Sequence, residues 1–201
     1  MYSEKIQHIL SVMVTIPVLL VCLPFFIVIA LLIKADSKGS VLFIQERIGK
    51  NGKKFKLLKF RSMLNDAHDT GIEDASEKDP RITKVGKFIR EWTIDEFPQL
   101  LNIISGDMNL IGPRPMPEYE GNNKKIRKLW EERKKIRPGL ISMVDIKGRN
   151  LVPWEKRFEY DAWYIKNKSF FLDLKILFFA VFAVLSRKGV YGENEKNILP
   201  K

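Results

Sequence analysis

The feature of this sequence that most constrains its fold is a long apolar segment near the N-terminus. No charged residue occurs within residues 9–33. As a straight helix this segment would reach roughly 37 Å at 1.5 Å per residue, which is enough to cross a hydrocarbon core of about 30 Å. A cleaved signal peptide is the competing interpretation, but its apolar region is usually about 7 to 15 residues long and ends at a small-residue cleavage site. We therefore expect the segment to stay on the mature protein.

Pro24 lies in the middle of this segment. It has no N–H to donate to the Leu20 carbonyl, and its ring clashes with that carbonyl, so we expect the helix to kink there. A kink at mid-depth permits two topologies: the helix crosses the membrane with a bend, or it enters and returns to the same face. Because proline is tolerated in spanning helices, the residues alone favour spanning.

Charge indicates the side on which the rest of the chain lies and the partners it suits. Basic residues follow the apolar segment closely: Lys34, Lys38, Arg47, Lys50, Lys53 and Lys54. Such residues are retained in the cytoplasm, whereas Lys5 and Glu4 before the segment roughly cancel. The formal net charge of +11 implies an anionic partner, which could be nucleic acid, an anionic membrane surface or a phosphorylated substrate.

Composition limits the remaining possibilities. A chain of 201 residues is long enough for one domain with its own core. The single cysteine, Cys22, excludes an intramolecular disulfide. Only two histidines, His8 and His68, are present, which argues against a zinc site.

A second apolar run, residues 176–185, lies near the C-terminus. As a helix it would span only about 15 Å, which is too short to cross a bilayer. It fits an interfacial helix with Lys175, Arg187 and Lys188 near lipid head groups. A buried core helix is equally compatible with the pattern.

Three elements are expected between these apolar runs. Residues 41–63 read as two short strands joined by a basic, glycine-containing turn at 49–53. Residues 65–81 are polar and acidic, as in a surface loop. Residues 82–92 follow a helical period, with the apolar positions Ile82, Val85, Phe88, Ile89 and Trp92 on one face and Arg81, Lys84, Lys87 and Arg90 on another. That basic stripe fits either a solvated face or contact with lipid phosphates.

The stretch TIDEFPQL, residues 93–100, places Asp95 and Glu96 side by side. Thr93 and Glu96 have the spacing of a capping box, but Pro98 would then fall where an intrahelical N–H is expected. With Asp95 as the N-cap instead, the missing N–H of Pro98 costs nothing. The helix start would then favour an ionised carboxylate and a nearby phosphate, so Asp95 is either a cap or a catalytic group.

Two arginines stand beside prolines. Arg114 lies within GPRP, and Arg137 precedes Pro138 and Gly139. A stiff backbone presents the guanidinium with little loss of entropy, and its planar fork suits phosphate oxygens. Exposed arginines in ordinary turns are the alternative.

Taken together, KFRSM, TIDEFPQLLNIISGDMNLIGPRP and IRPG followed by GRN, in that order, resemble the bacterial sugar transferase family, small membrane-associated phosphoglycosyl transferases that begin glycan assembly. The resemblance covers nearly the whole chain, from the apolar N-terminal segment to the Phe- and Leu-rich C-terminal helix. It implies transfer of a sugar 1-phosphate from a UDP-sugar to a polyprenol phosphate, such as undecaprenyl phosphate, with Mg²⁺ and release of UMP.

The resemblance also implies roles for individual residues. Asp95 is the nucleophile that forms a phosphosugar-aspartyl intermediate, and Glu96 beside it is a metal ligand or handles the acceptor's proton. Asp95 and Glu96 are the candidate Mg²⁺ ligands. The candidate nucleotide and phosphate contacts are Lys59, Arg61, Arg114, Arg137 and Arg149.

In the family the N-terminal helix is re-entrant, broken at a Ser-Pro, with both ends cytoplasmic. Here Leu23 replaces that serine before Pro24, which removes a side chain able to bond a freed carbonyl. A second departure is the run from Leu140 to Lys147, where the family commonly shows a Thr-Gly-Trp-Ala-Gln-Val-Asn-like sequence. The change predicts that the protein uses a different sugar or binds the nucleotide more weakly, with the fold retained.

The expected architecture is therefore α+β and predominantly helical. It comprises a re-entrant membrane helix broken at Pro24 (1–36), a cytoplasmic catalytic domain with a short β-hairpin and interfacial amphipathic helices (37–190), and a polar tail (191–201). The expected location is the cytoplasmic face of a bacterial inner membrane, with membrane lipid and downstream glycosyltransferases as further partners. The alternative is a membrane-tethered scaffold or degenerate, non-catalytic lipid-binding member. Nucleic acid is not expected, because no nucleic-acid motif accompanies the basic residues.

Overall fold

The computed structural model describes residues 2–64, 79–123 and 125–191. In chain order these form α1 (Glu4–Asp36), β1 (Leu42–Ile48), β2 (Lys54–Phe60), α2 (Lys84–Glu91), α3 (Gln99–Ile104), β3 (Asn109–Ile111), α4 (Arg127–Arg133), β4 (Gly139–Ile141), α5 (Trp154–Asn167) and α6 (Phe170–Ser186). Short 3-10 turns are η1 (Lys50–Gly52), η3 (Ile94–Glu96), η4 (Glu118–Asn122) and η5 (Arg149–Leu151). The predicted α+β, predominantly helical architecture is confirmed. Most of the expected loop at 65–81 and of the tail at 191–201 lies outside the described residues.

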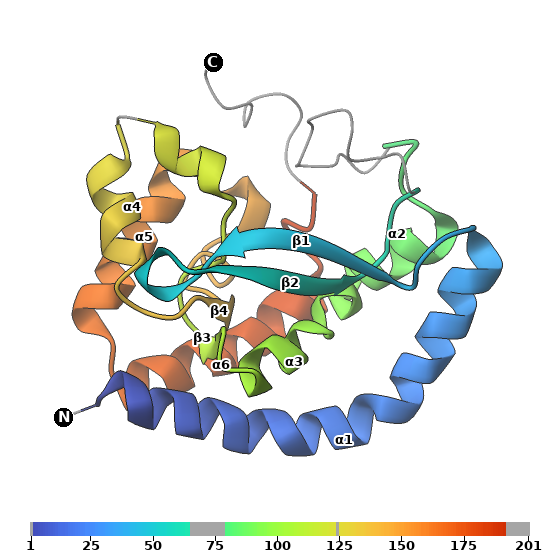
Figure 1. Cartoon of the computed structure of the whole chain (residues 1–201), viewed down its shortest axis with the longest axis horizontal. Coiled ribbons are helices and arrows are strands. Elements are labelled where there is room, and N and C mark those ends of the chain that lie inside the picture. Colours follow the sequence, from blue (N-terminus) through green and yellow to red (C-terminus); the bar gives the residue numbers. More distant parts are fainter. Residues whose placement is uncertain (1, 65–78, 124, 192–201) are drawn as a thin grey trace.

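The predicted hairpin is present. Strands β1 and β2 pair antiparallel from Leu42 opposite Phe60 to Ile48 opposite Lys54. The turn between them contains Asn51 and Gly52 with φ of 56° and 75°, a left-handed conformation that Asn and Gly tolerate best. The hairpin runs across the middle of the molecule, with α4 and α5 near its turn and α2 near its open end (Figure 1).

A second, smaller pairing joins two segments that are far apart in the sequence. Strand β3 lies parallel to β4, with Asn109 opposite Gly139 and Ile111 opposite Ile141. The backbones touch just beyond β3, where a Cβ added to Gly139 would lie 2.0 Å from the backbone nitrogen of Gly112. Only glycine allows this approach. The sequence pattern did not predict the pair, which brings the GPRP and IRPG segments together.

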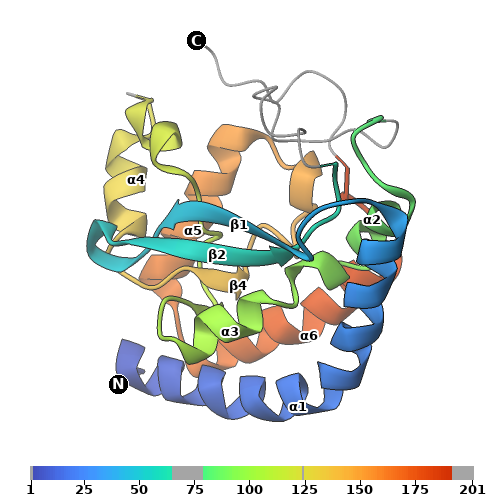
Figure 2. The same ribbon diagram turned by 45° about the vertical axis from the view of Figure 1, so that its right-hand side comes forward.

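The apolar N-terminal segment is one continuous helix, α1, that bends around the lower side of the molecule (Figures 1 and 2). It contains both Pro17 and Pro24, and each removes a backbone hydrogen bond from the ladder. The bend agrees with the expected kink, and the helix continues through Pro24 to Asp36 without an interruption (Figure 1). The inner face of α1 packs Val12, Leu19 and Phe26 against the core beneath the hairpin.

The outer face of α1 is apolar and exposed. Within the described residues α1 is the one helix long and apolar enough to cross a membrane, and only 11% of its most apolar window is buried. A core helix of a water-soluble protein would be mostly covered. This uncovered face indicates association with a membrane.

The N-terminal end of α1 is fastened to the body by polar contacts. Glu4 forms ion pairs with Lys50 and with Arg137, the latter at 3.1 Å. One turn later, Nε2 of Gln7 donates to the Tyr164 hydroxyl at 2.7 Å and to Asp173 at 2.8 Å. These partners come from η1, from the segment before β4 and from α5 and α6.

The C-terminal end of α1 is fastened by Arg61, which follows β2. Its buried guanidinium donates to the carbonyl oxygens of Lys38 at 2.6 Å, Ser37 at 2.7 Å and Ile33 at 3.3 Å. The carbonyls of Ser37 and Lys38 lie at or beyond the helix end and have no intrahelical partner, whereas that of Ile33 also accepts the Ser37 N–H at 3.2 Å. Both ends of α1 are thus tied to the same globular body.

Helix α6 combines the two alternatives that the sequence left open. Ile176 and Ala180 face the core, whereas Phe171 is 79% exposed on the outside, together with Phe178 and Phe182. The start of α6 adjoins the start of α1, where the Tyr2 hydroxyl donates to Asp173 at 2.5 Å. The exposed face supports the interfacial interpretation, and the buried face supplies part of the core.

Replacing Arg61 should destabilise the protein through α1. Arg61→Ala removes the donors for the three carbonyl groups, and an unsatisfied buried polar group costs about 1–3 kcal/mol. We expect a loss of roughly that size in the free energy of unfolding, measured by denaturant titration in detergent. Lys34→Ala, at an exposed position of the same helix end, is the matched control. Equal stability of the two variants would contradict the anchoring role.

Candidate active site

Asp95 and Glu96 lie in the turn η3, between α2 and α3, and both are nearly buried, with 9% and 7% of their surface exposed. Both cap interpretations are wrong. Thr93 makes no side-chain cap hydrogen bond, and α3 begins at Gln99 with Pro98 at the N-cap position. Asp95 therefore does not sit at the start of an α-helix, and the expected help from a helix dipole does not apply.

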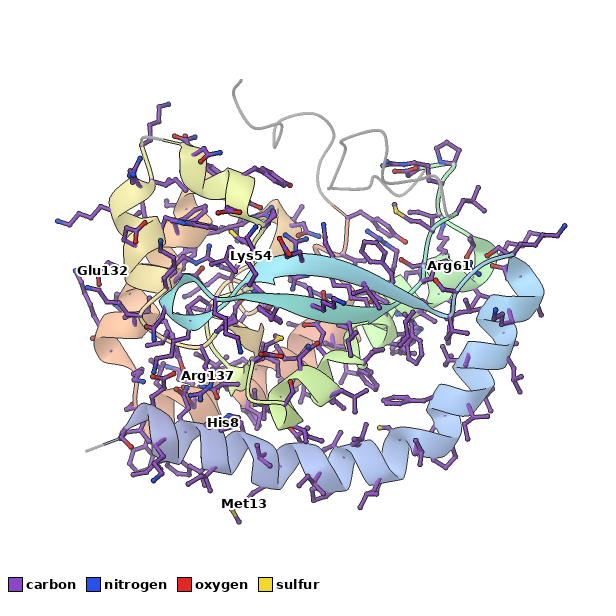
Figure 3. The ribbon with its side chains drawn as sticks, in the orientation of Figure 1. His8, Met13, Lys54, Arg61, Glu132 and Arg137 are labelled. Atoms are coloured by element: carbon purple, nitrogen blue, oxygen red, sulfur yellow. The ribbon has the colours of Figure 1, made fainter. Side chains whose placement is uncertain are left out.

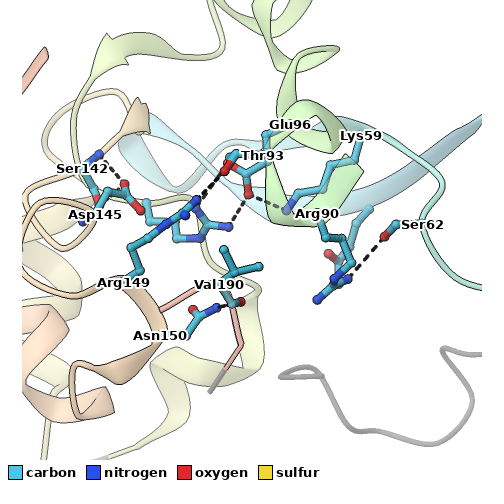
Figure 4. A network of polar contacts seen from close by, with 12 residues as sticks. Lys59, Ser62, Arg90, Thr93, Glu96, Ser142, Asp145, Arg149, Asn150 and Val190 are labelled. Atoms are coloured by element: carbon cyan, nitrogen blue, oxygen red, sulfur yellow. Dashed lines mark hydrogen bonds and ion pairs between the residues drawn. The ribbon is translucent and has the colours of Figure 1, made fainter. Parts of the chain in front are cut away.

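Glu96 is held by two cations from distant segments (Figure 4). Nζ of Lys59, on β2, donates to its Oε1 at 2.9 Å. Arg114, in the GPRP segment after β3, donates through Nη2 to the same oxygen and through Nη1 to Oε2 at 3.4 Å. Burial alone would raise the pKa of Glu96, but the charges of Arg114 and Lys59 outweigh it and hold that pKa well below its usual range.

Asp95 differs from Glu96 in its hydrogen bonds and in the direction of its pKa shift. It accepts no hydrogen bond from the residues that the structure describes. Burial raises the pKa of its carboxyl group, and the charge of Glu96 adds to this, while Lys59, Arg90 and Arg114 act against it. A carboxylate without hydrogen bonds keeps its oxygen lone pairs available, so of the two neighbouring acids Asp95 is the one free to react.

Two strained residues are joined beside this turn. Thr93 has φ of 58° and Arg149 has φ of 57°, a left-handed conformation that is unusual for residues other than glycine and especially for a β-branched one. Nη2 of Arg149 donates to the Thr93 hydroxyl at 2.5 Å. Such strain persists where surrounding contacts hold it, and it is typical of functional sites.

The other terminal nitrogen of the Arg149 guanidinium, Nη1, is buried and has no hydrogen-bond partner among the residues that the structure describes. A buried charged donor without a partner is costly. An anion bound beside Arg149 would satisfy it. The structure thus places three of the predicted phosphate contacts, Lys59, Arg114 and Arg149, around the acidic pair.

The remaining two predicted contacts lie elsewhere. Arg61 is engaged with the C-terminal end of α1, and Arg137 donates to the Gly106 carbonyl at 2.8 Å and to Glu4. Figure 3 shows the two arginines on opposite sides of the molecule. Their described contacts hold α1 in place.

Sequence reasoning missed Arg90 and Thr93 as parts of the site. Arg90, assigned to a basic stripe on α2, donates to the Ser62 hydroxyl at 3.3 Å, and its charge acts on the pKa of Asp95. The signal that could have found it was its position five residues before Asp95, at the end of a helix that leads directly into the turn.

The altered loop at 140–147 is internally bonded. Asp145 accepts hydrogen bonds from the backbone N–H and the hydroxyl of Ser142, both at 2.7 Å. Its charge also acts on Arg114. The loop therefore lies near the site, and its expected effect on the choice of sugar stays a prediction.

The donor set for a metal ion is small. The described residues hold no group of three or more His, Cys, Asp or Glu side chains that could bind one. Both oxygens of Glu96 already accept hydrogen bonds from cationic groups, whereas those of Asp95 are free. A hard ion such as Mg²⁺ commonly needs only one or two carboxylates when substrate phosphates complete its shell, and Asp95 fits that pattern.

The chain is similar in sequence to several known proteins. A family model described as bacterial sugar transferase matches residues 2–187. The chain is 39% identical over 189 residues to a UDP-glucose:undecaprenyl-phosphate glucose-1-phosphate transferase of Klebsiella pneumoniae, which covers 90% of this chain and 40% of that protein. It is 33% identical over 209 residues to a UDP-galactose-lipid carrier transferase of Erwinia amylovora, covering 94% of this chain and 42% of that protein.

A relative of similar size is the sugar transferase EpsL of Bacillus subtilis, which is 41% identical over 182 residues, covering 88% of this chain and 86% of that protein. The chain thus spans about 40% of the length of the first relatives and most of the Bacillus protein.

Replacing Glu96 by Gln should lower the pKa of Asp95. The substitution removes the negative charge that raises this pKa, while Lys59 and Arg114 remain and then act on Asp95 alone. The measurement is a carbon-13 NMR titration of the Asp95 carboxyl group in wild type and variant. Glu159→Gln, at an exposed position of α5, is the control and should leave the titration unchanged. A higher pKa of Asp95 in Glu96→Gln would contradict the assignment of charges.

Proposed function

The chain belongs to the bacterial sugar transferase family, and from this premise we propose that it transfers a sugar 1-phosphate from a UDP-sugar to a polyprenol phosphate. Undecaprenyl phosphate is the acceptor in the name of the Klebsiella relative, and we propose the same acceptor for this chain. The reaction would be the first membrane step of glycoconjugate assembly, and its product would pass to downstream glycosyltransferases. The names of the relatives include both UDP-glucose and UDP-galactose, so the sugar is left open.

The observation that carries the proposal is Asp95, a buried carboxylate without hydrogen bonds beside a cluster of cations. A carboxylate oxygen of Asp95 attacks the phosphorus that bears the sugar, and the bond from that phosphorus to the UMP oxygen breaks. UMP leaves with the bonding electrons. A phosphate oxygen of the polyprenol phosphate then attacks the same phosphorus, and Asp95 is released.

The cations serve the charge on the phosphates. Lys59, Arg114 and Arg149 surround the acidic pair and would bind the diphosphate oxygens and the charge that develops on the departing UMP. Glu96 fixes Lys59 and Arg114 in position, so its first role is to orient these cations. The alternative role, taking the acceptor's proton, is less favoured because Arg114 and Lys59 hold the pKa of Glu96 well below its usual range and make it a weak base.

Mg²⁺ is proposed as the cofactor. Asp95 would hold the ion together with phosphate oxygens of the donor, and Glu96 could join only by exchanging its contacts with Lys59 and Arg114. When bound, the ion supplies neutralisation of phosphate charge.

We also propose that α1 is re-entrant and that the protein lies on the cytoplasmic face of the bacterial inner membrane. Support comes from the anchoring of both helix ends on one body, through Glu4 at the start and Arg61 at the end. A helix whose ends are held on the same body does not leave them on opposite sides of a bilayer. The basic residues after α1 favour the cytoplasmic side.

Asp95→Asn should abolish the reaction while the protein stays folded and membrane-bound. Wild type should release about one equivalent of UMP per enzyme from its UDP-sugar without acceptor, and the variant should lose this burst by more than about a thousandfold. UMP is measured by quenched flow or a coupled assay over a panel of UDP-sugars. Asp107→Asn, the same change outside the turn, is the matched control.

Two outcomes would contradict the proposal. Substantial transfer of sugar 1-phosphate by Asp95→Asn would contradict the covalent mechanism. Absence of UMP with every donor, with liposome binding unaffected by Asp95→Asn, would favour the membrane-tethered scaffold.

The topology is tested by cysteine labelling. In a Cys22→Ser background, Lys5→Cys at the start of α1 and Lys156→Cys on α5 should both react with a membrane-impermeant maleimide only from the cytoplasmic side, since both positions are exposed on one body. Inverted vesicles and spheroplasts give the two directions. Labelling of Lys5→Cys from the periplasmic side would show a spanning helix.

A further inference from the structure

An open groove of about 290 Å³ lies between the last turns of α6 and the loop at 145–149. Its lining includes charged and aromatic side chains: Asp145, Arg149, Phe179, Phe182 and Lys188. The loop belongs to the active-site side of the molecule, and α6 belongs to the exposed apolar side. The groove therefore joins two surfaces of opposite character.

The polar end of the groove is continuous with the active site. Arg149 lines the groove and also donates to Thr93, two residues before Asp95. Its Nη1 is buried and lacks a hydrogen-bond partner within the described part of the chain. Figure 4 shows Asp145 bonded to Ser142 beside Arg149; one oxygen of Asp145, Oδ2, accepts both the backbone N–H and the hydroxyl of Ser142. With Lys188 added, the lining suits an anion.

The other end of the groove is aromatic and faces outward. Phe179 is 45% exposed and Phe182 is 54% exposed, on the helix whose outer face indicates contact with lipid. A water-soluble ligand gains little from two phenylalanines that open toward a bilayer. A long prenyl chain gains contact with them while the rest of the chain stays in lipid.

The walls of the groove are held together by backbone contacts. The backbone N–H of Asn150 donates to the Gly189 carbonyl at 3.1 Å, and its side-chain amide donates to the Val190 carbonyl at 2.7 Å. A Cβ on Gly189 would lie 2.3 Å from the Gly148 carbonyl oxygen. The segment after α6 is thus fixed against the loop, and the groove exists before any ligand binds.

We propose that this groove binds the acceptor, with the phosphate of a polyprenyl phosphate at Arg149 and Lys188 and its first prenyl units against Phe179 and Phe182. The assignment rests on the proposed transferase function. It gives the acceptor a path from the bilayer along α6 to Arg149, which the acceptor phosphate would occupy after UMP has left.

The test measures binding and the two half-reactions separately. Binding of radiolabelled undecaprenyl phosphate to the full-length protein in nanodiscs should weaken about tenfold in Phe182→Ala and in Lys188→Gln. The KM for this acceptor should rise by a similar factor, while the UMP burst from UDP-sugar alone persists. Phe171→Ala and Lys175→Gln, exposed on the same helix but outside the groove, are the matched controls.

Three results would overturn the assignment of the groove to the acceptor. Wild-type binding and KM in both groove variants would exclude the groove as the acceptor site. Equal displacement of the acceptor by phosphatidylglycerol would make it a general lipid site, and a rise only in the KM for UDP-sugar would assign it to the donor. If wild type released no UMP with any donor, the transferase proposal would fail, and the binding measurement would still judge the groove by itself.

Discussion

The rest of the site depends on the ion pairs that Lys59 and Arg114 form with Glu96. They join the hairpin, the turn before α3 and the segment after β3, three parts of the chain that share no local structure. The two adjacent carboxyl groups also have opposite pKa shifts. The charge of Glu96 is offset by ion pairs with Arg114 and Lys59, whereas burial raises the pKa of Asp95, and such a difference between neighbouring acids is typical of functional sites.

The same principle fixes the position of the membrane helix. Apolar contacts are non-directional, so they do not by themselves fix the position and orientation of an apolar helix on a protein surface. The ion pairs of Glu4 and the hydrogen bonds of Arg61 supply that direction at its two ends. Arginines that the family motifs would suggest for phosphate binding therefore serve to hold the helix, and the body and its membrane element form one unit.

Features set by local pattern could be predicted from the sequence. The two short strands with a glycine-containing turn predicted the hairpin, and the helical period predicted α2. The family resemblance, rather than a local pattern, named Lys59, Arg114 and Arg149 together; the structure brings them near the acidic pair, and their role in the reaction stays a prediction. The cap assignment of Asp95 was wrong because the conformation of Thr93 is supported by Arg149, 56 residues away in the sequence. The pairing of β3 with β4 and the placement of Arg61 and Arg137 also depend on contacts between distant segments, which no local pattern encodes.

The approach of Gly112 to Gly139 has a consequence for how such chains can vary. A side chain on either residue would meet main-chain atoms of the other segment, at 2.8 Å from Gly112 and 2.0 Å from Gly139. Backbone atoms are common to all residue types, so shortening a neighbouring side chain would not relieve the contact. A chimera that exchanges the GPRP or the IRPG segment between relatives must carry glycine on both sides of this joint.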